Sequence, residues 1–197
     1  MDVFGQLKDK LLLQLRSGLP PFLSYHNDVH TLEVIKSCEE IAERENIKDG
    51  DSLLKLKLAA LYHDAGYLTG THEHEAKSCE LFRSHTFKLF SNGMTDNVCE
   101  LIMATQIPQS PKNKLAEILC DADLDYLGRD DFFIYSEKLY QEFKHFGKVK
   151  NMLDFDRLQT EFLATHRYFT ASSKLLRQPV KEKNLETIRE RMKQYPA

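Results

Sequence analysis

Apolar residues recur every three or four positions along most of this 197-residue chain, the spacing of one face of an α-helix. The first such face comprises Phe4, Leu7, Leu11 and Leu15, and Gly18 follows it as a helix end. No segment combines strict apolar/polar alternation with the β-branched enrichment typical of a strand. Every glycine and proline lies at or near a boundary between helical segments. The pattern therefore predicts an all-α fold, an irregular multi-helix bundle.

The length and the absence of a linker or internal repeat favour a single domain. We expect one domain over residues 1–197, with a motif-bearing core at about 24–128 and C-terminal helices at 129–197 packed onto it. Within it, Ser24 is a candidate cap for the second helix. The last helix is expected from about Lys183 to Met192.

Composition indicates a soluble globular protein, with 42% hydrophobic residues and a mean hydropathy of -0.47. No run of about 18 apolar residues exists, so we expect no membrane span, and the N-terminus lacks the basic region of a signal peptide. The net charge of -3 gives no electrostatic reason to expect nucleic-acid binding. The four cysteines are dispersed without a CxxC motif, which favours reduced, buried thiols in a cytoplasmic protein.

The strongest chemical signal is His63-Asp64, which follows the apolar run LAALY and precedes AGY. Histidine and aspartate are both metal-ligand types, although a histidine favoured by the helix dipole and an aspartate bonding loop amides would explain the pair alone. His26 and His30, in YHNDVH, are four residues apart and would share one face of a helix. Spacing does not say whether both bind a metal.

Three carboxylates alternate in DADLD, at Asp121, Asp123 and Asp125. Because three acids in five residues cannot all be buried without partners, at least one should face a cation, a basic side chain or solvent. His72 and His74, just after the His63-Asp64 loop, could add a second ion or simply be polar residues of a helix's first turn. Together these residues suit a mixed nitrogen and oxygen site for Mn, Fe, Co, Ni, Zn or Mg, which can activate water against a phosphate ester.

The order H…HD…D on an all-α chain resembles the HD-domain superfamily of metal-dependent phosphohydrolases. The resemblance covers roughly residues 24–128 and implies that His30, His63, Asp64 and Asp123 hold the metal. Asp123 is favoured over Asp121 because the family's last aspartate is usually followed by leucine or Arg-Leu, and ADL fits that pattern.

Two shorter elements refine this resemblance. YHNDVH is similar to the YHNxxH element of class I cyclic-nucleotide phosphodiesterases, which implies that His26 is the general acid and His30 a metal ligand. This chain is much shorter than those catalytic domains, and for their purine-binding glutamine it offers Gln106 and Gln109 by residue type alone. HEAKS resembles the HExxS element of small bacterial HD proteins of unassigned substrate, in which His74 would be the better second-site ligand and His72 the weaker.

The sequence thus predicts an enzyme that hydrolyses a phosphate ester of a nucleotide or another small molecule. One or two divalent ions would activate a water near Asp64, and His26 would protonate the leaving oxygen. Arg129, just after the DADLD segment, is a candidate phosphate contact. We expect no membrane or nucleic-acid partner. Substrate, metal, ion number and oligomeric state stay open.

Two other functions compete with this one. The pair His72 and His74 would also suit a di-iron oxygenase, because some HD-fold proteins such as inositol oxygenase use an expanded histidine set around two irons. A non-catalytic nucleotide-sensing module with a vestigial site is the third possibility, and the full set of motif residues argues against it.

Overall fold

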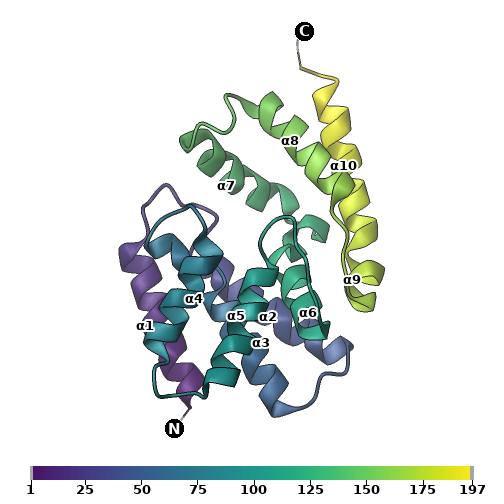
Figure 1. Ribbon diagram of the computed structural model, residues 1–197. Coiled ribbons are helices and arrows are strands. Elements are labelled where there is room, and N and C mark those ends of the chain that lie inside the picture. Colours follow the sequence, from purple (N-terminus) through teal and green to yellow (C-terminus); the bar gives the residue numbers. More distant parts are fainter. Residues whose placement is uncertain (1, 196–197) are drawn as a thin grey trace. The chain divides into compact units, whose positions relative to one another are not determined.

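The computed structural model describes residues 2–195, and in that range it contains ten α-helices, two 3-10 helices and no strand (Figure 1). The all-α fold predicted from the apolar spacing is confirmed. Contacts between Cα atoms divide the chain into two compact units, residues 1–20 with 26–123 and residues 21–25 with 124–197. The single domain expected for residues 1–197 stays a prediction.

The first unit contains six α-helices and one 3-10 helix. They are α1 (Val3–Gly18), α2 (Asp28–Arg44), α3 (Gly50–Tyr62), η1 (Ala65–Leu68), α4 (His74–His85), α5 (Asn92–Ala104) and α6 (Lys114–Asp123). Helix α3 is central, since it packs against α2, α5 and α6 and also contacts α1 and α4. All its residues from Leu58 to Tyr62 are fully buried. A stretch of helix that is apolar on every side lies in the core, and this one carries the residues after it into the interior.

The second unit contains η2 (Asp125–Gly128), α7 (Phe132–His145), α8 (Met152–Thr165), α9 (Ala171–Leu176) and α10 (Gln178–Met192). Helix α10 packs along α8 and also contacts η2 and α9 (Figure 1). The core of this unit is largely aromatic and aliphatic: Tyr25, Leu124, Tyr126, Leu127, Phe132, Leu163, Leu185 and Ile188.

The expected start of the last helix at Lys183 is wrong. Helix α10 begins at Gln178 and has Pro179 in its first turn. A proline is tolerated there because the first helical N–H groups have no partner within the helix. The short helix α9 was not predicted. None of the helices in residues 2–195 has the combined length and apolar character that a membrane span requires.

Helix α4 and η1 pack unusually closely at Gly66. A Cβ atom on Gly66 would lie 2.0 Å from the carbonyl oxygen of His74 and 2.8 Å from the backbone nitrogen of Ser78. Only glycine therefore allows α4 to lie against the turn that follows His63-Asp64.

We predict that Gly66→Ala lowers the free energy of unfolding by about 2 to 3 kcal/mol, the usual cost of overpacking, because backbone atoms of α4 would have to move. Urea unfolding measures the change. Gly50→Ala, at the start of α3 with no atom within 4 Å of the added Cβ, should stay within about 0.5 kcal/mol of the wild type. Equal losses in both variants would contradict this account of the packing.

Candidate metal centre

His30 lies in the first turn of α2 and is buried. The side chain of Asn27 caps this helix by accepting hydrogen bonds from the backbone N–H groups of Val29 and His30. The cap predicted at Ser24 is therefore wrong, and so is a shared helical face for His26 and His30. His26 precedes the helix, and its ring centroid lies 6.2 Å from that of His30.

His63 and Asp64 lie where α3 ends. His63 still has helical angles, with φ -51 and ψ -41, whereas Asp64 has φ -104 and ψ 3. Adjacent residues of a regular helix point about 100° apart, so this change of backbone conformation lets both side chains turn toward one point. Both are buried, and one oxygen of Asp64, Oδ2, has no hydrogen-bond partner among the described residues.

Three donor atoms from these residues form a nearly regular triangle. His30 Nε2 lies 3.3 Å from His63 Nε2 and 3.5 Å from Asp64 Oδ2, and His63 Nε2 lies 3.2 Å from Asp64 Oδ2. Ligands bound to one ion at about 2.1 Å are separated by about 3.0 to 3.4 Å, so the triangle has the size of one face of a metal's coordination shell. His30, His63 and Asp64 are thus a group that could hold a metal ion.

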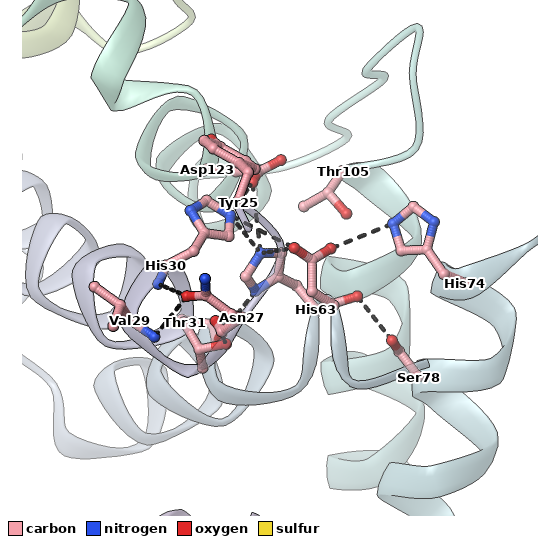
Figure 2. A network of polar contacts seen from close by, with 12 residues as sticks. Tyr25, Asn27, Val29, His30, Thr31, His63, His74, Ser78, Thr105 and Asp123 are labelled. Atoms are coloured by element: carbon pink, nitrogen blue, oxygen red, sulfur yellow. Dashed lines mark hydrogen bonds and ion pairs between the residues drawn. The ribbon is translucent and has the colours of Figure 1, made fainter. Parts of the chain in front are cut away.

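Asp123, at the end of α6, approaches the same two imidazoles. Its Oδ1 lies 3.3 Å from His30 Nε2 and 3.5 Å from His63 Nε2, and Figure 2 shows the three side chains converging. The other acids of DADLD lie differently, because Asp121 is fully buried and Asp125 accepts two hydrogen bonds from Arg177. Among the three, Asp123 is the acid whose carboxylate contacts both His30 and His63.

A backbone contact fixes the tautomer of His63. Its Nδ1 lies 2.8 Å from the carbonyl oxygen of Ala60, one turn back in α3. Because a carbonyl can only accept, Nδ1 carries the proton, and in the neutral ring Nε2 presents its lone pair to the triangle. Such an outer hydrogen bond is the usual support of a metal-binding histidine.

The electrostatics of the cluster favour positive charge. Burial alone would lower the pKa of His63, but the carboxylates of Asp64 and Asp123 raise it well above its ordinary value. Burial would raise the pKa of both acids, but the imidazoles hold the pKa of Asp64 well below its usual range and lower that of Asp123 to about 2. Two ionised carboxylates in a buried site are stabilised by a cation.

His74 lies on the other side of Asp64. Its Nε2 is 3.3 Å from Asp64 Oδ1 and 3.5 Å from Glu75 Oε1, and Glu75 is buried. Asp64 thus faces the triangle with one oxygen and His74 with the other. The sequence did not single out Glu75: HEAKS shows an acid next to a candidate ligand, but only the structure shows that this acid is buried. His72 is exposed, and no contact joins it to these residues within the described chain.

Comparison with known families identifies the family of this chain. A family model described as HD domain matches residues 27–125, just over half of the chain. The chain belongs to the HD-domain family. A comparison with curated proteins found none that matches it. The HD-domain match includes His30, the His63-Asp64 pair and Asp123, whereas His26 and Arg129 lie outside it.

His26 and Arg129 have defined surroundings of their own. The ring of His26 stacks on Tyr67 with centroids 4.6 Å apart, and Tyr67 in turn stacks on His74 at 4.3 Å. Arg129 belongs to the second unit, where its guanidinium donates two hydrogen bonds to Asp131 and lies over the ring of Tyr135. The roles of His26 as general acid and of Arg129 as phosphate contact stay predictions.

Ser78 links α4 to the HD motif. Its hydroxyl donates to the carbonyl oxygen of His63 and accepts from the backbone N–H of Gly66, each at 2.8 Å, and the residue is fully buried. These two bonds hold both ends of the turn that contains Asp64.

We predict that Ser78→Ala weakens Mn²⁺ binding by about 10- to 100-fold, the usual effect of removing a group that orients a ligand, because the turn around Asp64 loses both bonds. Isothermal titration calorimetry on metal-free protein measures the affinity. Ser84→Ala is the matched control, since Ser84 is exposed on the same helix and should bind as the wild type does. Unchanged affinity in Ser78→Ala would show that the turn needs no such support.

Proposed function

We propose that this HD-domain protein is a metal-dependent phosphohydrolase that cleaves a phosphate ester of a nucleotide or a related small molecule. The observation that carries the proposal is the buried triangle of His30, His63 and Asp64, with Asp123 beside it. Its donor set, two imidazole nitrogens and carboxylate oxygens, fits a divalent ion of the Mn, Fe, Co, Ni or Zn type, and Mg²⁺ if more waters complete the shell.

When bound, a divalent ion supplies Lewis-acid activation of water and neutralises charge on the phosphate. The protein's part is to hold the donors in place before substrate arrives. His63 is oriented by Ala60, and Asp64 by the turn that Ser78 secures. Burial lowers the effective dielectric constant around this cluster and so strengthens its electrostatic interactions.

His26 is proposed as the group that protonates the leaving oxygen. Its ring lies in the first unit with the triangle, is half-buried, and is kept in position by stacking on Tyr67. A histidine is suited to this role because its ordinary pKa lies near neutrality. The likeness of YHNDVH to the phosphodiesterase element supports the assignment and a nucleotide substrate.

We propose a second ion held by Asp64 Oδ1, His74 and Glu75. The two contacts of His74 Nε2, at 3.3 Å to Asp64 and 3.5 Å to Glu75, support it. Asp64 would then contribute one oxygen to each site, and two ions would neutralise the charge of a phosphate group more effectively than one alone.

The test is a panel assay with Mn²⁺-loaded protein on cyclic nucleotides, nucleoside mono- and triphosphates, (p)ppGpp and an aryl phosphate. Wild-type protein should hydrolyse one substrate class. Asp64→Asn should lose turnover by at least about 10³-fold, because it removes a carboxylate charge from the triangle and from the side that faces His74. Wild-type rates in Asp64→Asn would sink the proposal.

His26→Gln separates proton transfer from metal binding. We expect turnover to fall by about 10²- to 10⁴-fold, the usual contribution of a general acid, with Mn²⁺ affinity unchanged in calorimetry. The loss should shrink on an aryl ester whose leaving group needs no proton. His145→Gln, in which an exposed histidine of the second unit is changed, is the control for the substitution itself. An equal loss on both ester types would remove His26 from the acid role.

A di-iron oxygenase is the second candidate, and the contacts of His74 with Asp64 and Glu75 favour it because they would permit two ions. Protein purified in air would then contain two irons and show visible absorption. Hydrolysis by colourless, iron-free, Mn²⁺-loaded protein would exclude it. Tight nucleotide binding without turnover under any metal would favour the sensing module instead.

A further inference from the structure

A pocket of about 490 Å³ lies within the second unit, apart from the residues of the metal centre. It is formed by the C-terminal end of α8, the segment 166–168, α9 and α10 from Gln178 to Arg189. Four of its lining side chains are basic, at Arg167, Lys174, Lys181 and Arg189, and Glu182 is its only acid. The volume is in the range of small-molecule sites.

Lys181 is the least expected of these residues, because it is only 2% exposed. Its Nζ donates to the carbonyl oxygen of His166 and lies 3.3 Å from His166 Nδ1. Among the described residues no carboxylate lies within ion-pair distance of Lys181. Burial lowers the pKa of Lys181; the carboxylate of Glu182 opposes this shift, and the positive charge of Arg167 adds a smaller effect in the same direction as burial.

A purely structural role does not explain this lysine well. Its bond to the carbonyl of His166 could be made by a neutral donor, without the cost of removing an ammonium group from water. An ammonium has three N–H donors, and the contacts of Lys181 with His166 account for two of them. A buried cation that has no counter-ion and lines a pocket is typical of a binding site.

The other three cations of the pocket are exposed and make few polar contacts. Arg167 makes no hydrogen bond or ion pair with any described residue, and Lys174 donates to the carbonyl oxygen of Phe169. Arg189 lies 3.6 Å from the carboxylate of Glu186, a half-exposed pair of little strength. These like charges gather on one pocket of a chain whose net charge is -3.

We propose that this pocket binds a small molecule that carries a diphosphate or triphosphate group. One carboxylate or one phosphate ester would neutralise only one or two of four cations, whereas a chain of phosphates can contact several of them at once. Arginine and lysine both bind phosphate oxygens through strong, charge-assisted hydrogen bonds. A nucleotide and an inorganic oligophosphate both supply such a chain of phosphates, and the chemistry that the pocket recognises is the same.

The test is calorimetric titration of the metal-free, full-length protein with tripolyphosphate at low salt. Wild-type protein should bind one equivalent, and Arg167→Ala and Arg189→Ala should each weaken binding on the order of tenfold, with Lys181→Met abolishing it. The affinity should fall steeply as salt is raised. Since Lys181→Met could destabilise its unit, the two exposed arginine variants, checked by thermal melting, decide the result.

Lys183→Ala is the matched control, because Lys183 is exposed on the same helix and does not line the pocket. Equal weakening of binding in Lys183→Ala would show that only the overall charge of the protein matters, and would overturn the proposal. Absence of binding, or arginine variants that bind like the wild type, would overturn it as well. Titrations with ATP and AMP separate the sources. Tighter binding of ATP than of tripolyphosphate indicates a nucleotide, equal binding indicates the oligophosphate alone, and AMP that binds as tightly as either contradicts the phosphate-chain requirement.

Discussion

The burial of the Asp64 carboxylate is the constraint on which the first unit depends. Taking an ionised carboxylate out of water costs several kcal/mol unless opposite charge and hydrogen bonds compensate. In this protein the compensation comes from His63 and His30 on one oxygen and from His74 on the other. In the neutral form that binds a metal, the imidazoles repay only part of that cost. The cluster is therefore built for added positive charge, which a divalent ion would supply.

The surrounding helices keep the Asp64 carboxylate buried. The last five residues of α3, Leu58 to Tyr62, are apolar on every side, so this end of the helix lies in the interior and His63-Asp64 is carried there with it. The turn that follows is then held by Ser78 and closed by α4, which can approach because Gly66 has no side chain. Packing, hydrogen bonding and charge thus act on the same few residues. A substitution at any of these residues should therefore alter the metal centre.

Much of this was predictable from the sequence, for identifiable reasons. Helical spacing of apolar residues is a local property, so the helices and the buried run before His63 could be predicted. The grouping of His30, His63 and Asp64 was also predicted, because the order H…HD…D resembles a known pattern. The cap at Asn27 was not, since Ser24 is an equally good capping residue and only tertiary packing decides between them.

Residues whose role depends on distant partners escaped prediction. Glu75 resembles any acid in a helix's first turn until its burial beside His74 is known. Lys181 resembles one more cation of a polar helix, and nothing in its neighbours along the chain indicates that it is buried. Charged residues usually stay in water, and these two are exceptions. A sequence shows that a residue is charged but not that it is buried.

The two units present the same physical problem with opposite signs. In the first, carboxylates are buried around donors that suit a cation. In the second, Lys181 is buried at a pocket lined by further cations, and no carboxylate of the described residues is near enough to pair with it. Folding alone does not favour either arrangement, because apolar residues of similar volume would fill the same space at lower cost. Each is explained if a ligand of opposite charge contributes to the stability of the unit that binds it, so that binding and folding are linked.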